Sequence, residues 1–161
     1  MGITIVVLAL GLIFTVWVIR LFNRFVTLRT LKEEGWSGVL TALKRRRDFI
    51  SNIVKTVMPH ESETLRNIAQ PQAARSVAET AKAEASITEA LAGLRATIEN
   101  HPDLKEELSE LEKRIEKTRR YYNATVRDFN MEMDQFPASL IVGLMGFKRA
   151  AFFEADEQPH E

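Results

Sequence analysis

The chain opens with an unbroken apolar run, and after it apolar residues recur every three or four positions almost to the end. Residues 1–19 contain no ionisable side chain before Arg20. A helix of that length rises about 28 Å, close to the hydrocarbon thickness of a bilayer, and in lipid only a helix pairs every backbone amide within one segment. A signal peptide would carry a cationic start and a small-residue cleavage site, and neither is found in this run. The run therefore predicts a retained transmembrane anchor at 1–20.

Cations flank this run on one side only. Arg20, Arg24, Arg29 and Lys32 follow it, and none precedes it. The excess of Lys and Arg marks the cytoplasmic side of a membrane helix. We expect a single pass, a short N-terminus outside the cell and a cytoplasmic domain.

The helical periodicity predicts one domain at 21–136 built from three long helices, at about 21–58, 61–98 and 103–136. Prolines near 59, 102 and 137 separate them, and Pro71 predicts a kink in the second. The third has a coiled-coil seam with one stutter. Its seam positions are Leu104, Leu108, Leu111, Ile115, Thr118, Tyr122, Val126, Phe129, Met133 and Phe136. The fold class is all-α: an N-terminal transmembrane helix followed by an elongated antiparallel three-helix bundle, with the C-terminal segment carried far from the bilayer.

The segment 137–153 is apolar, and ten residues within it, 138–147, are nearly uncharged and too few to span a bilayer. It could fold back on the bundle, contact a subunit or partner, or dip into a membrane interface. Its candidate contact residues are Leu140, Ile141, Leu144, Phe147, Phe152 and Phe153. The acidic residues 154–161 are expected to form a solvated, disordered tail.

Two sets of polar residues stand on or beside the apolar stripes. We expect the basic run Arg45, Arg46 and Arg47 to pair with acidic residues of the second or third helix, with a partner or subunit contact and a lipid contact as alternatives. Amides and a phenol on a helix seam usually set the register between helices. The candidate register residues are Asn52, Tyr122, Asn123 and Asn130.

The composition excludes several kinds of chemistry. The 22 basic and 22 acidic residues leave no net charge, which disfavours nucleic acid as a partner. There is no cysteine, and His60, His101 and His160 have no second ligand at helical spacing. The carboxylates around Glu110 interleave with cations, as on a solvated helix face. We expect no cofactor, no metal site and no enzymatic activity.

Several short motifs occur in an order that resembles the LemA family of bacterial membrane proteins. They are Trp36-Ser37, Arg45 to Ile50 with Asn52-Ile53-Val54, His60-Glu61 with Thr64-Leu65, His101 to Lys105, Arg120 to Asn123, Phe136-Pro137, Gly146-Phe147 and Phe152-Phe153-Glu154. The chain departs from the family in having Ser51 where proline is common and a longer polar stretch around Pro71. The resemblance implies a helical domain behind an anchor in the bacterial inner membrane and supplies no biochemical activity.

The leading functional prediction is therefore a membrane-anchored scaffold or assembly protein that self-associates as a homo-oligomer, docks a protein partner, or both. The alternative is a helical binding module in membrane-linked signalling or envelope-stress response. The two differ in whether the partner is a second copy or a dissociable protein.

Overall fold

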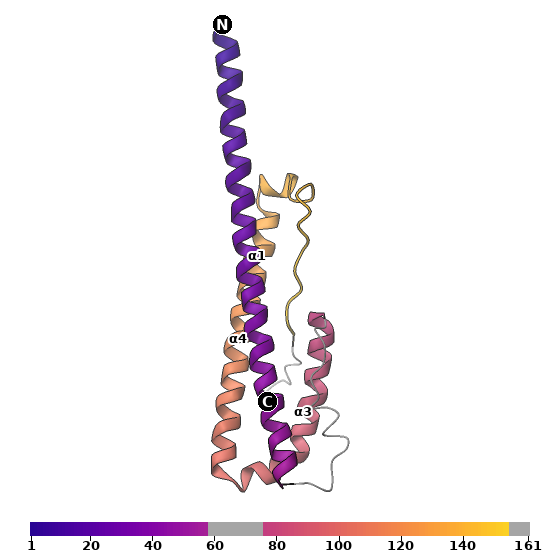
Figure 1. Ribbon diagram of the computed structural model, residues 1–161. Coiled ribbons are helices and arrows are strands. Elements are labelled where there is room, and N and C mark those ends of the chain that lie inside the picture. Colours follow the sequence, from indigo (N-terminus) through magenta and orange to yellow (C-terminus); the bar gives the residue numbers. More distant parts are fainter. Residues whose placement is uncertain (58–75, 155–161) are drawn as a thin grey trace. The chain divides into compact units, whose positions relative to one another are not determined.

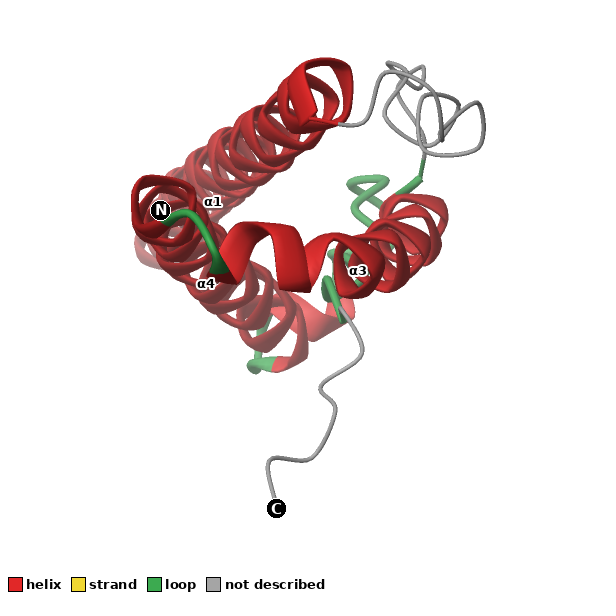
Figure 2. Cartoon of the chain, turned by 90° about the horizontal axis from the view of Figure 1, so that it is seen from below, coloured by secondary structure: helices red, strands yellow, loops and turns green. Residues whose placement is uncertain are grey.

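The computed structural model describes residues 1–57 and 76–154, and these residues form helices joined by loops, with no strand among them (Figures 1 and 2). The all-α prediction is confirmed. The elements are α1 (Gly2–Val57), α3 (Val77–Glu99), α4 (Pro102–Asp134) and the short 3-10 helix η1 (Ala138–Leu140). The predicted tail at 155–161 and the predicted kink at Pro71 lie outside the described residues.

The predicted anchor and the first predicted helix are one element. Helix α1 continues from Gly2 to Val57, through Gly35 and Gly38. A glycine inside a helix costs about 1 kcal/mol relative to alanine, which is too little to end a helix that packs on both sides of it. The boundary near Arg20 is thus a change in surface chemistry along a continuous backbone.

The chain divides into two compact units. The first contains Met1–Glu34 and Ala124–Ala150, and the second contains Gly35–Asn123 and Ala151–Glu161. Helices α1 and α4 each contribute one part to both units. Each unit has its own apolar core.

The core of the second unit lies between α1, α3 and α4. Eight side chains are buried together in it: Phe49, Ile50, Ile53, Val54, Ile87, Leu91, Leu94 and Ile98. Leu104, Leu108 and Leu111 of the predicted seam pack against them. Figure 1 shows α3 running in the same direction as α1, whereas α4 runs in the opposite direction. The prediction that successive helices alternate in direction assumed short connectors. Nineteen residues, 58–76, separate α1 from α3, and these two helices run in the same direction.

Helix α3 begins and ends at recognisable caps. The Ser76 hydroxyl accepts from the Glu79 amide, and the Glu79 carboxylate accepts from the Ser76 amide, which completes a capping box. Asn100 is the C-cap, and Pro102 opens α4 at a position where a missing N–H costs nothing.

The core of the first unit lies between α1, α4 and the segment after α4. Its buried members are Leu21, Phe25, Phe129, Met133, Ala138 and Val142. The prediction that the C-terminal segment lies far from the anchor is therefore wrong. The segment instead packs against Leu21 and Phe25 of α1, directly after the apolar run. Phe136 was expected on the seam but is 80% exposed, because α4 ends at Asp134.

Candidate functional site

The most distinctive surface of the first unit is the turn formed by residues 136–147, called here the apolar turn. It follows α4 and contains η1, a further turn and Gly146, whose φ of 75° lies in the left-handed region that favours glycine. No residue in it carries a charge. Its inner face buries Ala138 and Val142 against Leu21 and Phe25 of α1.

Aromatic rings fix the apolar turn to α1 and α4. Phe25 is fully buried and stacks on Phe147 at 5.0 Å between ring centroids. It also meets Phe129 edge-on at 6.0 Å, and Phe147 meets Phe129 at 6.2 Å. The Lys32 ammonium lies 5.1 Å from the centre of the Phe129 ring, within the range of a cation–π interaction. Phe25 is therefore the side chain that joins all three segments.

The outer face of the apolar turn is uncovered. Leu144 is 89% exposed, Leu140 is 69% exposed and Phe136 is 80% exposed. Large apolar side chains exposed singly are normal, but several on one short turn mark a contact surface. Of the predicted contact residues, Ile141 and Phe147 instead face inward and are half-buried against the core. The inner face of this segment packs against α1 and α4, as expected if the segment folds back on the bundle. Its outer face has no such contact within the described residues and stays exposed.

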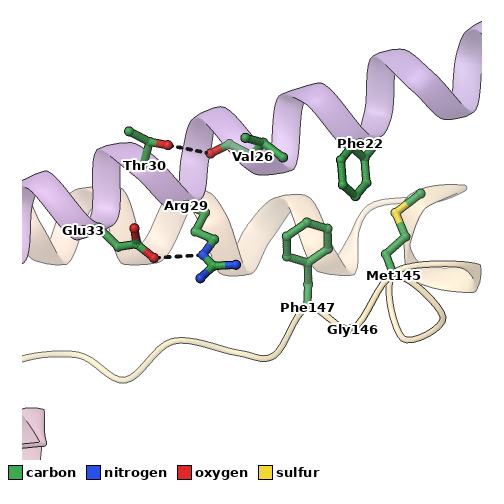
Figure 3. Close-up of a pocket in the computed structure, with 8 residues that line it drawn as sticks. All are labelled: Phe22, Val26, Arg29, Thr30, Glu33, Met145, Gly146 and Phe147. Carbon is green, nitrogen blue, oxygen red and sulfur yellow. Dashed lines mark hydrogen bonds and ion pairs between the residues drawn. The ribbon is translucent and has the colours of Figure 1, made fainter.

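A pocket of about 290 Å³ lies between α1 and the apolar turn (Figure 3). Phe22, Val26, Met145 and Phe147 line one end, and Arg29, Thr30 and Glu33 line the other. Arg29 Nε lies 2.8 Å from Glu33 Oε1, and this hydrogen-bonded cation lowers the pKa of the Glu33 carboxyl. The pocket thus changes from apolar to polar along α1, away from the N-terminus.

Asn130 holds the chain that leaves the apolar turn. Its side-chain amide donates to the Ala150 carbonyl at 3.0 Å and accepts from the Ala150 amide at 2.9 Å. This two-bond arrangement, called here the Asn130 latch, satisfies both backbone groups of one extended residue. Arg149 also forms an ion pair with Asp134, and Arg24 pairs with Glu132 at 2.7 Å.

The second unit repeats the arrangement in the Asn123 latch. The Asn123 side chain donates to the Phe153 carbonyl at 3.1 Å and accepts from the Phe153 amide at 2.9 Å. The Tyr122 hydroxyl donates to the Ala151 carbonyl at 2.8 Å, and burial raises the pKa of Tyr122.

Trp36 closes the second unit around the buried Phe153. Its ring centre lies 5.6 Å from that of Phe153 and 5.2 Å from that of Tyr122. The neighbouring Phe152 is 44% exposed. The side chains of Tyr122, Asn123 and Asn130, which the sequence predicts to set the register between helices, bond instead to the backbone of the C-terminal chain at Ala151, Phe153 and Ala150. Asn52 is exposed on α1, which does not correspond to a buried register position.

The predicted basic run splits into different environments, because consecutive helical residues point about 100° apart. Arg46 is buried and Arg47 is half-buried, and both face Glu84 of α3, whereas Arg45 is exposed. Arg47 Nη1 lies 3.0 Å from Glu84 Oε1, and Arg46 Nη2 lies 3.8 Å from Glu84 Oε2 and donates to the Thr88 hydroxyl at 2.9 Å. The expected pairing with an acidic residue is therefore present for two of the three arginines.

Burial dominates the electrostatics of this cluster. It raises the pKa of Glu84 against the opposing charges of Arg46 and Arg47, and it lowers the pKa of Arg46. Within the described chain, Arg46 Nε and Glu84 Oε2 are buried without a hydrogen bond. The sequence reasoning did not single out Glu84. It was detectable, because Thr80, Glu84, Ile87 and Leu91 share one helical face in an alanine-rich stretch.

No group of three or more metal-ligating side chains occurs within residues 1–57 and 76–154. His101 lies in the connection between α3 and α4. His60 and His160 lie outside the described residues.

These features define a class: an all-α protein with a candidate membrane span near its N-terminus and a C-terminal chain held by side-chain amides. The chain belongs to the LemA family, whose sequence model matches residues 35–161. The family resemblance of the motifs from Trp36 to Glu154 is thereby confirmed. A comparison with curated proteins gives no match.

Proposed function

We propose that this LemA-family chain is a membrane-anchored helical scaffold that self-associates and performs no catalysis. The observation that carries the proposal is the exposed apolar surface of α1. Its N-terminal part has a mean hydropathy of 2.7 over its most apolar 18-residue window, and none of that window is buried. A helix that is apolar all round and uncovered by protein needs lipid around it.

The side chains along this part of α1 support a span rather than a packed helix. Leu8, Leu10, Leu12 and Ile13 point to different sides of the helix, and each is more than 60% exposed. The Thr15 hydroxyl donates to the Gly11 carbonyl at 2.9 Å, so this polar side chain is satisfied within the helix itself. Arg20 and Arg24 follow, so we place the helical domain on the cytoplasmic side of the bacterial inner membrane.

Extraction of membranes with alkaline carbonate tests the anchor. The wild-type chain is expected to stay in the membrane pellet. A variant with Leu8→Arg and Leu12→Arg should move to the supernatant, since each arginine costs about 2.5–3.5 kcal/mol at the centre of a span. The matched control with Leu8→Ile and Leu12→Ile keeps the apolar surface and should stay in the pellet. A wild-type chain found in the supernatant would overturn the proposal.

Self-association is tested separately by light scattering of the intact chain in a mild detergent. We expect a mass above that of one chain after the detergent contribution is subtracted. A strict monomer at micromolar concentration would refute the assembly half of the proposal and leave the anchor intact.

The second candidate function, a binding module in membrane-linked signalling or envelope-stress response, is supported by the exposed pair Lys44 and Arg45. Because Arg46 and Arg47 pair with Glu84, an acidic partner would be recognised by Lys44 and Arg45. Reversing both charges with Glu should abolish capture of such a partner without loss of helicity. The same reversal at Lys113 and Lys117, on α4, is the control. Unchanged capture would exclude this candidate.

A further inference from the structure

The apolar turn has an outer face that nothing in the chain explains. Phe136, Leu140 and Leu144 are exposed while the inner residues Ala138 and Val142 are buried. The turn is uncharged throughout, and the two residues that follow it, Lys148 and Arg149, are exposed cations. An apolar loop followed by cations has the composition of a segment that lies at a membrane surface.

Its position along α1 indicates which surface it meets. The turn packs against Leu21 and Phe25, with Trp17 and Leu28 at the edges of the same cluster. If residues up to 19 occupy the hydrocarbon, Leu21 lies about 3 Å beyond it and Phe25 about 9 Å beyond it, at 1.5 Å per residue. The headgroup layer on each side of a bilayer is about 5–7 Å thick. The turn therefore lies at the depth of the headgroups.

The surrounding charges agree with this depth. Arg20 and Lys148 are exposed and adjoin Leu21 and Phe147 of the same apolar cluster, and Arg24 and Arg149 pair with Glu132 and Asp134. Long cationic side chains at this level reach lipid phosphates while their stems cover apolar surface. The pocket beside the turn also passes from apolar at Phe22 to polar at Glu33, which follows the polarity change from hydrocarbon to water.

We propose that the apolar turn is a second membrane contact, inserted into the interface of the anionic bilayer that holds the anchor. The inference rests on the proposed function, because it takes the depth of the turn from the anchor. Lipid is the occupant rather than a second copy, since the half-exposed Phe22 of α1 meets Phe147 of the apolar turn at 6.0 Å between ring centroids, which joins the turn to the exposed apolar surface of α1.

The absence of cysteine allows a direct test with single-cysteine variants of the full chain. Leu144→Cys and Leu140→Cys are labelled with an environment-sensitive fluorophore and reconstituted into vesicles of phosphatidylethanolamine and phosphatidylglycerol. Both labels should be quenched by lipid carrying a spin label near its headgroup and should be several-fold less accessible to aqueous iodide than the control label at Lys113→Cys. Lys113 lies on α4, and its side chain is 70% exposed.

A label at Leu10→Cys tests the anchor separately from the interfacial contact of the apolar turn. If Leu10 is quenched by lipid spin-labelled deep in the acyl chain while Leu140 and Leu144 remain open to iodide, the interfacial contact is refuted and the anchor stands. If Leu10 is also open to iodide, the anchor and the contact both fail. If the label at position 144 is shielded from iodide and from spin-labelled lipid, and the unlabelled Leu144→Cys variant forms an interchain disulfide when two thiols are oxidised by added copper phenanthroline and oxygen, a second copy covers the turn and the lipid assignment is wrong.

Discussion

The Asn130 latch allows a quantitative prediction about how the C-terminal chain is held. Replacing Asn130 by Ala removes both side-chain bonds to Ala150 and leaves the backbone of α4 unchanged. Each hydrogen bond contributes about 0.5–1.5 kcal/mol, so the free energy of opening the segment should fall by about 1–3 kcal/mol. That change corresponds to about a 5- to 150-fold increase in the population of the open state.

Hydrogen exchange measured by mass spectrometry on the intact chain in detergent reads this population. Peptides covering 148–154 should exchange faster in Asn130→Ala by that factor, and helicity should not decrease, because alanine favours a helix more than asparagine does. Asn130→Asp is informative as well. It keeps an acceptor for the Ala150 amide but replaces the donor to the Ala150 carbonyl, so we expect release there too.

The matched control is Asn52→Ala, the same substitution at an exposed position of α1. It should leave exchange at 148–154 unchanged. Equal exchange in wild type and Asn130→Ala, or an equal increase in Asn52→Ala, would show that the amide does not hold the segment.

Three further predictions concern stability and can be read from urea unfolding. Burial raises the pKa of Glu84, so the stability that this group contributes is complete below its unfolded pKa of about 4.5 and is lost as pH rises through the raised folded pKa. Glu84→Gln should therefore reduce the loss of unfolding free energy between pH 4 and pH 7, and an unchanged dependence on pH would contradict the assignment. Phe25→Ala should lower the free energy of unfolding by about 3–5 kcal/mol because it empties the centre of the first unit. Replacing the half-exposed Phe22 by Ala should lower it clearly less, and equal losses would refute the packing. Ser76→Ala should cost about 1 kcal/mol and speed exchange at the start of α3, and a loss that Ser76→Asp does not restore would exclude the cap.

Helix positions were largely predictable because their signals are local. The third predicted helix, 103–136, corresponds to α4 at Pro102–Asp134, and its seam residues from Leu104 to Met133 are buried or half-buried. The position of a helix depends on the spacing of apolar side chains within it and on the prolines that end it. The second predicted helix, 61–98, has its start outside the described residues; within them α3 begins at Val77, where Ser76 and Glu79 carry the capping-box signature in the sequence.

The site residues were predictable as types but not as partners. Asn123 and Asn130 were expected to form hydrogen bonds that set the register between helices. Which backbone groups they bond to depends on the path of the chain after Pro137. Arg46 and Arg47 were expected to find an acidic residue, and only the packing of α3 on α1 selects Glu84. Pairings between distant segments are set by tertiary contacts, so no local pattern specifies them.

The sequence by itself determined that α1 begins with an apolar surface, that the described body is helical, and which faces of the helices are apolar. These properties follow from the side-chain period of a helix and from the cost of leaving its backbone unpaired in lipid. Only the tertiary structure decided that α3 runs in the direction of α1 and that the apolar turn packs against Leu21 and Phe25 of α1. Direction and docking depend on the summed burial of residues such as Phe25, Phe129 and Val142, which lie more than a hundred positions apart at the extremes and meet only in the folded chain.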